Sequence, residues 1–156
     1  MKIKWLNTPE DHDYASAASY LSLLFDEPSV LTLTDNLKKA PMSQFQAKDI
    51  FRSSGLSLLN KSNSHVDSDR NKIKIGIKLS PLLLVRDSIN RKLIIADGYH
   101  RLCAVYSFYE NAIIPCKIVW STNSSASIIL VLPKLSSVKN KHWGHVLNES
   151  TIFDES

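Results

Sequence analysis

Residues 97–101, Asp-Gly-Tyr-His-Arg, have the types and spacing that could bind an anion. An apolar, β-branched run at 93–96 precedes them and apolar residues at helical spacing follow, so Gly98 falls at a strand-to-helix turn. Such a turn directs free backbone N–H groups and the positive end of the helix dipole at one point. His100 and Arg101 would add side-chain donors there, and we expect the anion to be a phosphate.

An alternative needs no ligand: His100 and Arg101 pair with acids of the chain, such as Asp97 or Glu110. The N-terminal end of the helix dipole is positive, so cations in the first helical turn are unfavourable and acids are preferred there. A bound anion would offset this cost, so we favour the anion site.

The elements expected around this turn make an α+β domain. A five-residue turn at 87–91 joins two apolar strands and predicts a hairpin, which gives a mixed sheet with flanking helices. We expect helices at 8–24, 28–40, 65–75 and 99–109, a helical turn at 48–53 closed by Gly55, and strands at 42–47, 82–85, 93–96 and 113–119.

The 156 residues, 44% of them hydrophobic and 22% charged, fit one domain with a sizeable core. We expect a helical extension at 1–40, a core at 41–120, and an extra strand with a polar tail at 121–156. The net charge of +4 is spread evenly along the chain, which permits anionic ligands but gives no strong basic patch.

Targeting and redox signals are sparse. No stretch approaches the ~18 apolar residues of a membrane helix, and the first residues lack the apolar segment of a signal peptide. We therefore expect a cytoplasmic protein with no membrane contact, in which Cys103 and Cys116 are buried, reduced thiols.

Two groups of metal-ligand types do not predict a metal site. Residues 11–13, Asp-His-Asp, lie at a helix start, where acids are ordinary capping groups. His142 and His145 have helical spacing but no third ligand nearby.

Residues 79–104 and 114–116 resemble the superfamily of ParB N-terminal domains and sulfiredoxin. In that superfamily a strand ends in Gly-x-[His/Arg]-Arg, the next helix carries an early alanine, and an x-Ile-Pro strand follows. Here these are the segments 98–101, Ala104 and 113–115. The similarity spans roughly a quarter of the chain and implies a ParB/sulfiredoxin-like mixed sheet.

The resemblance also implies a nucleotide, ATP or CTP with Mg²⁺, whose phosphates lie on this turn. Residue by residue, Gly98 would allow close backbone approach, Tyr99 would line the site, and His100 and Arg101 would contact phosphate oxygens. Asp97 would cap the turn or help hold Mg²⁺.

The chain also departs from the family pattern. Sulfiredoxin has a nucleophilic cysteine where this chain has Tyr99, and a phenol with a pKa near ~10 cannot replace a thiolate. Partition proteins add a helix-turn-helix domain, for which residues 121–156 are too few and too polar. We therefore expect neither sulfinic acid reduction nor sequence-specific DNA binding.

Three further side chains could complete the site. Lys48 could supply a point charge to phosphate, or be a solvated surface lysine. His65 begins a helix in the region where relatives hold the nucleotide, or is a local cap. Asp49, Asp97 and His100 are the candidates for acid–base work.

Three functions follow from this pattern. The first is a nucleotide-dependent phosphoryl-transfer or hydrolysing enzyme. The second is a nucleotide-responsive module that binds a protein partner without chemistry, so catalysis itself is left open. The third, a ParB-like nuclease, would need a carboxylate–metal cluster and a basic groove, and the sequence shows neither.

Overall fold

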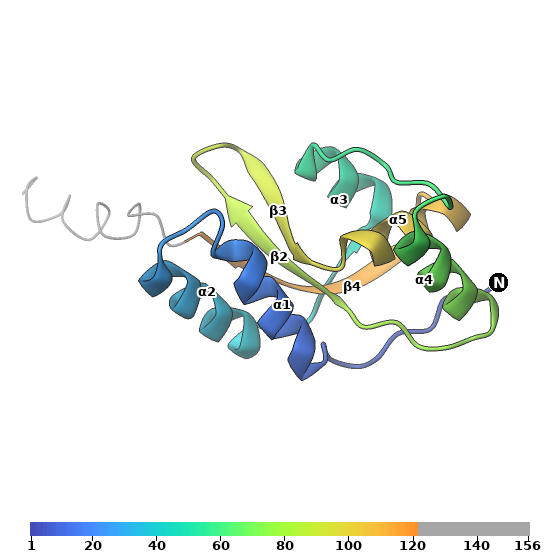
Figure 1. Ribbon diagram of the computed structural model, residues 1–156, viewed down its shortest axis with the longest axis horizontal. Helices are drawn as coiled ribbons and strands as arrows, with labels where there is room; N and C mark the ends of the chain where they lie inside the picture. The colour runs from blue at the N-terminus through green and yellow to red at the C-terminus, as the bar shows by residue number, and fades with distance from the viewer. Residues whose placement is uncertain (122–156) are drawn as a thin grey trace, which may run out of the picture. The chain divides into compact units, whose positions relative to one another are not determined.

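The computed structural model describes residues 1–121, in which four strands form one mixed sheet with the order β1-β4-β2-β3 (Figure 1). Strand β2 pairs with β4 in parallel, whereas the β2–β3 and β1–β4 pairs are antiparallel. The expected hairpin and mixed sheet are therefore confirmed. The strands are β1 (Ser43–Gln46), β2 (Leu82–Asp87), β3 (Lys92–Asp97) and β4 (Ile113–Trp120).

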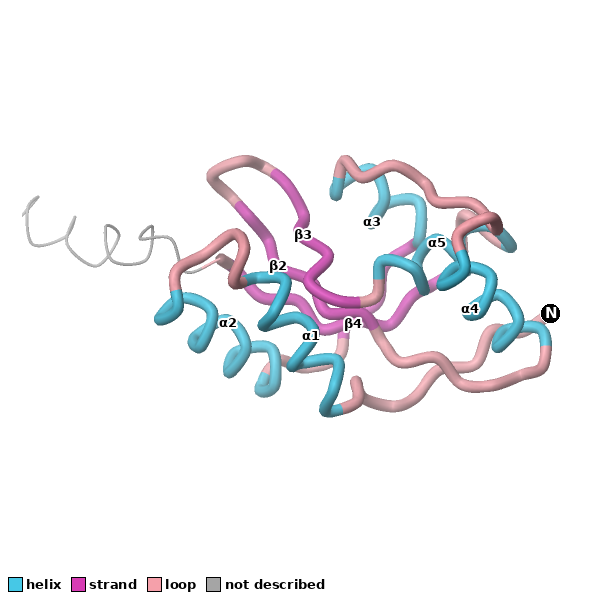
Figure 2. The backbone as a smooth tube through the Cα atoms, viewed as in Figure 1, coloured by secondary structure: helices cyan, strands magenta, loops and turns pink. Residues whose placement is uncertain are grey.

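Within residues 1–121, five helices flank the sheet (Figure 2), which confirms the α+β class. They are α1 (Asp11–Leu21), α2 (Glu27–Lys39), α3 (Ala47–Ser54), α4 (Ser64–Lys74) and α5 (Tyr99–Phe108). The expected helical extension at 1–40 begins only at α1, because the preceding segment instead forms a β-bridge between Trp5 and Leu79.

Local capping explains several helix boundaries. The Asp26 side chain accepts a hydrogen bond from the N–H of Ser29 at 3.0 Å and begins α2, and Asn63 caps α4 in the same way. Gly55 ends α3 in the left-handed conformation, with φ of 66°, as its position after the helical turn predicts.

The central strand β2 is buried on both faces, which explains its uninterrupted apolar run. Leu82 and Leu84 pack into a core with α3, α4 and α5. Leu83 and Val85 point to the other face and pack with α1 and α2. The N-terminal helices are thus a structural layer of a three-layer fold, and they cover a sheet face that would otherwise be exposed (Figure 1).

Residues Met1–Ser121 form one compact unit. Of the expected strand and polar tail at 121–156, everything after Ser121, including His142 and His145, lies outside the described residues. None of the helices at 1–121 is long and apolar enough to span a bilayer.

Candidate anion site at the turn between β3 and α5

The backbone at Gly98 has a conformation and surroundings that only glycine tolerates. Its φ is 101°, in the left-handed region. A Cβ atom at this position would lie 2.7 Å from Cγ of Leu82 and 3.1 Å from Nη2 of Arg101. The expected strand-to-helix turn is confirmed, and an irregularity in the β2–β3 pairing immediately precedes it.

Helix α5 begins without a side-chain cap. Its first intrahelical bond runs from the N–H of Leu102 to the carbonyl of Gly98, at 2.9 Å. Within residues 1–121, the N–H groups of Tyr99, His100 and Arg101 donate to no protein acceptor. Three orphan donors therefore lie together at the positive end of the helix dipole.

A cleft of about 390 Å³ reaches this turn. Helix α1 forms one wall and the end of β3 with the start of α5 forms the other. The lining residues are Ser16, Tyr20, Leu56, Ile95, Ala96, Asp97, Gly98, Tyr99 and His100. Two of the three orphan donors, those of Tyr99 and His100, belong to residues that line this space, which is large enough for a small ligand.

Arg101 does not line this cleft, and its charge is balanced inside the protein. Its Nη2 lies 2.5 Å from Oδ2 of Asp97, and its Nη1 lies 3.4 Å from Oδ1 of Asp13. The side chain is only 16% exposed. Arg101 therefore pairs with Asp97, as the ligand-free alternative describes, and its second acid is Asp13 rather than Glu110.

Asp13 joins α1 to the turn through several polar contacts. Its carboxylate accepts hydrogen bonds from the Ser80 hydroxyl and from the N–H of Glu10, the latter at 2.8 Å. Burial raises the pKa of Asp13, but the Ser80 hydrogen bond and the charge of Arg101 outweigh it and hold the pKa below its ordinary value. Asp13 is therefore ionised at neutral pH.

The pKa of Asp97 is shifted in the opposite direction, above its ordinary value. Burial raises the pKa of Asp97, and the nearby Asp13 carboxylate adds to that rise, so Arg101 only partly offsets the shift. The two acids share one guanidinium, and Asp97 is the one that faces the cleft. A carboxyl of raised pKa in a cleft is a typical general acid–base candidate.

The structure brings His65 and His100 together, with ring centroids 4.9 Å apart. Burial, followed by the neighbouring His65, lowers the pKa of His100 below its ordinary value. At neutral pH His100 is uncharged, so it would bind a ligand as a hydrogen-bond donor or acceptor and not as a cation.

Tyr99 anchors the segment that leads from α3 to α4. Its hydroxyl donates to the carbonyl of Ser57, and its ring lies 5.7 Å from that of His100. Burial raises the pKa of Tyr99, so the phenol remains protonated. Its position between the cleft and this segment fits a positioning role.

The other two expected residues lie elsewhere. Lys48 is the second residue of α3, where its N–H donates to the carbonyl of Glu110 at 2.8 Å, and its side chain does not line the cleft. Asp49 pairs with Arg52 at 2.8 Å and lines a different hollow. The structure therefore assembles Asp97, Gly98, Tyr99, His100 and His65, and leaves Lys48 and Asp49 apart from them.

Sequence reasoning missed the contribution of α1. The capping role expected for the acids at 11–13 is confirmed for Asp13, which forms a capping box with Glu10. That local role gave no signal of the contacts to Ser80 and Arg101, which come from distant parts of the chain. Glu10, His12 and Asp13 also offer ligand atoms within 4.8 Å of one another.

Comparisons of the chain with protein-family models, with curated proteins and with solved structures found no match.

Proposed function

We propose that this protein binds a phosphorylated small molecule, a nucleotide with Mg²⁺, in the cleft beside Gly98. The observation that carries the proposal is the set of three unpartnered N–H groups at the start of α5, next to the cleft wall. Backbone N–H groups at a helix start are well suited to phosphate oxygens. The resemblance of residues 79–116 to the ParB/sulfiredoxin superfamily, whose members hold nucleotide phosphates on this turn, supports the same ligand.

The side chains divide the work in this proposal. His100, which lines the cleft, binds a phosphate oxygen, and His65 lies against the His100 ring without lining the cleft itself. Arg101 acts indirectly, because its guanidinium pairs with Asp97 and positions that carboxylate, while the backbone N–H groups bind the phosphates. This role differs from the direct phosphate contact that the resemblance implies.

The charge of Asp97 gives the Mg²⁺ ion a place in the proposal. Asp97 is the only carboxylate among the cleft-lining residues described, and it would repel a bare phosphate. Mg²⁺ is commonly bound by one or two carboxylates together with substrate phosphates. Asp97 would therefore hold Mg²⁺, which would supply the charge that the paired Arg101 does not.

The rest of the cleft fits a nucleoside. Tyr20 and Leu56, which are 41% and 37% exposed, offer an aromatic and an apolar surface on which a base could pack. Calorimetric titration with ATP and with CTP decides whether the base is adenine or cytosine.

Phosphoryl transfer or hydrolysis is the reaction that this site would support. In such a reaction Asp97 would hold the Mg²⁺ ion, which would neutralise charge on the phosphates. His100, which is uncharged at neutral pH, is the remaining acid–base candidate that lines the cleft. The second candidate is a nucleotide-responsive module that binds a protein partner without turnover. The internal pairing of Arg101 favours this second candidate, because it leaves no cationic side chain among the cleft residues to stabilise a phosphoryl transition state.

Isothermal titration of the full chain with ATP, CTP, ADP and inorganic phosphate, each with and without Mg²⁺, tests binding. We expect micromolar affinity for one Mg²⁺-nucleotide and a loss of about fivefold in His100→Gln, the worth of one hydrogen bond. Lys39→Gln, on the exposed surface of α2, is the matched control. No binding by any of the four compounds would refute the proposal.

Asp97→Asn separates the role of the metal from the role of the backbone. We expect it to weaken binding of the Mg²⁺-nucleotide and to strengthen binding of metal-free phosphate, because a repulsive charge is removed. Equal effects with and without Mg²⁺ would contradict the assignment of the ion to Asp97. Steady phosphate release that is lost in Asp97→Asn would establish the enzyme, and saturable binding without release would establish the module.

A further inference from the structure

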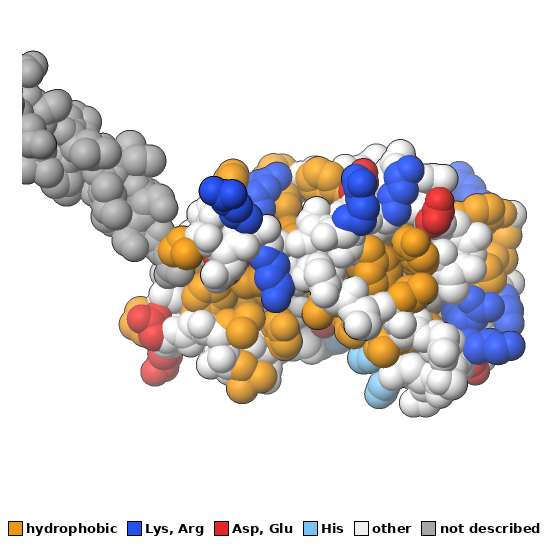
Figure 3. Space-filling model, turned by 90° about the horizontal axis from the view of Figure 1, so that it is seen from above, with side chains coloured by type: hydrophobic (Ala, Val, Ile, Leu, Met, Phe, Trp, Pro, Cys, Tyr) orange, Lys and Arg blue, Asp and Glu red, His pale blue; other side chains and the backbone are white. Residues whose placement is uncertain are grey.

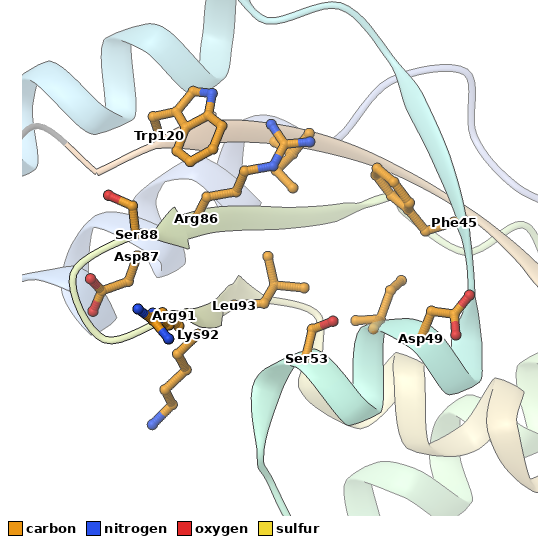
Figure 4. A pocket seen from close by; sticks show the side chains of 12 residues that line it. Phe45, Asp49, Ser53, Arg86, Asp87, Ser88, Arg91, Lys92, Leu93 and Trp120 are labelled. Atoms are coloured by element: carbon orange, nitrogen blue, oxygen red, sulfur yellow. The ribbon is translucent and has the colours of Figure 1, made fainter. Parts of the chain in front are cut away.

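A second hollow, of about 350 Å³, lies between α3 and the β2–β3 hairpin (Figure 4). It is separate from the cleft beside Gly98, because it includes Lys92 and Leu93 at the start of β3, whereas the cleft includes the end of that strand. Its surface is mainly apolar. The apolar and aromatic lining residues are Phe45, Ile50, Leu93, Ile118 and Trp120.

Arg86 places a positive charge in this apolar hollow. Its guanidinium carbon lies 5.0 Å from the centroid of the Trp120 ring, and Figure 4 shows the side chain extending between Trp120 and Phe45. Among residues 1–121, no acid pairs with Arg86 and its guanidinium donates no hydrogen bond. Stacking on an aromatic ring leaves the N–H donors of a guanidinium free, so within residues 1–121 the donors of Arg86 are available to a ligand.

The two acids of the hollow are already engaged. Asp49 pairs with Arg52 at 2.8 Å, and Asp87 accepts a hydrogen bond from the Asn90 side chain at 2.7 Å. The Asn90 hydrogen bond lowers the pKa of Asp87, so that carboxylate is charged, yet it lies at the end of β2, at one end of the hollow (Figure 4).

The hairpin adds further positive charge at this rim. Arg91 lies in the turn with φ of 52°, a left-handed conformation that non-glycine residues rarely adopt. Lys92 follows it, although Figure 4 shows the Lys92 side chain pointing away from the hollow. Figure 3 shows one face of the molecule, on which basic and apolar side chains are interspersed and acidic side chains are few.

We propose that this hollow binds a small organic acid, with a carboxylate head and an apolar aromatic or aliphatic body. The carboxylate would take the bidentate fork of Arg86, a geometry that guanidinium groups match. The body would pack on Leu93, Ile118 and the Trp120 ring. A fully inorganic anion would leave the apolar floor unused, and a neutral apolar ligand would leave the guanidinium without a counter-charge.

Tryptophan fluorescence and calorimetric titration of the full chain test this site with phenylacetate and octanoate as probes. Acetate supplies the head alone, and benzyl alcohol supplies an uncharged body. We expect phenylacetate or octanoate to bind, to change the emission of Trp120, and to bind at least tenfold more tightly than either acetate or benzyl alcohol. The emission change is assigned by its loss in Trp120→Phe.

Two variants locate the binding. Arg86→Gln should weaken phenylacetate at least tenfold, whereas Arg70→Gln, an arginine stacked on Phe108 outside the hollow, should leave its affinity unchanged. Ser53→Leu, on the exposed side of α3, fills the hollow and should abolish binding while the circular dichroism spectrum and melting temperature stay near the wild-type values.

The outcomes separate this site from the cleft beside Gly98. Absence of binding by both probes, or equal affinity in wild type and Arg86→Gln, overturns the proposal. Loss of phenylacetate binding in His100→Gln but not in Arg86→Gln would also overturn it, because it would place the acid in the other cleft. Failure of nucleotides to bind would leave this result unaffected.

Discussion

Replacing Arg101 with methionine is the most direct perturbation of the turn between β3 and α5. Methionine keeps the unbranched apolar stem of the side chain, is shorter by the end of the guanidinium, and removes the charge that lies between Asp13 and Asp97. The side chains of these acids are only 2% and 17% exposed. Two largely buried carboxyl groups would then lie close together without a cation between them.

The structure sets the size of the effect. Removing one partner of a buried ion pair costs about 3–5 kcal/mol, because the remaining charge is left uncompensated. Here Asp13 keeps its hydrogen bonds from Ser80 and Glu10, and Asp97 faces the cleft. We therefore expect the lower end of that range, about 3 kcal/mol less free energy of unfolding at pH 7.

The pH dependence follows from the directions of the pKa shifts. In the wild type the pKa of Asp13 is lowered, so its stabilising contribution is present above its unfolded pKa and is lost as the pH falls through the folded value. The pKa of Asp97 is raised, so its ionised form costs stability at neutral pH, and protonation relieves that cost as the pH falls. Without Arg101 the pKa values of both carboxyl groups rise. Lowering the pH then protonates them and removes their repulsion, so the difference in free energy of unfolding between the variant and the wild type becomes smaller.

Urea unfolding followed by circular dichroism at pH 7 and pH 4.5 measures the deficit at both ends. Arg52→Met is the matched control, because Arg52 pairs with Asp49 on an exposed helix surface, and we expect it to change stability little. A deficit in Arg101→Met below about 1 kcal/mol at pH 7, the value of a solvent-exposed pair, would refute the role of Arg101 described here. A deficit of the same size at both pH values would refute the argument from the two acids.

Two further perturbations test the packing around the site. Gly98→Ala should lower the free energy of unfolding by about 2–4 kcal/mol, because left-handed strain adds to a contact with Leu82. Gly55→Ala, also at positive φ but with open space around it, should cost about 1 kcal/mol, the left-handed strain alone. Equal losses for the two variants in urea unfolding would contradict this reasoning. Burial raises the pKa of Cys116 to about 12 and also raises that of Cys103. A disulfide reagent at pH 8 should therefore modify neither thiol until the protein unfolds. Modification of the native protein at the rate of a free thiol would contradict their burial.

Most of the fold could be predicted because its signals are local. Asp26, Asn63 and Gly55 mark helix boundaries by hydrogen bonds or backbone conformations within a few residues. The turn at Gly98 could also be predicted, because the apolar pattern changes from strand to helical periodicity on the two sides of a single glycine. The pairing order of the strands and the layer of α1 and α2 over the second sheet face depend on contacts between distant segments, and periodicity does not specify those.

The candidate site shows the same limit in its chemistry. Asp97 lies four residues before Arg101, so their pairing was visible as an alternative, but Asp13 lies 88 residues away on a helix that covers the other face of the sheet. Its local capping box with Glu10 already explained it, and a residue with a sufficient local explanation gives no signal of a second role. An arginine that binds a ligand and one that binds the protein's own acids need the same side chain after the same glycine. Only the position of a third residue, here Asp13, decides between them, which is why the anion site proposed for this turn rests on backbone donors and not on its most obvious cation.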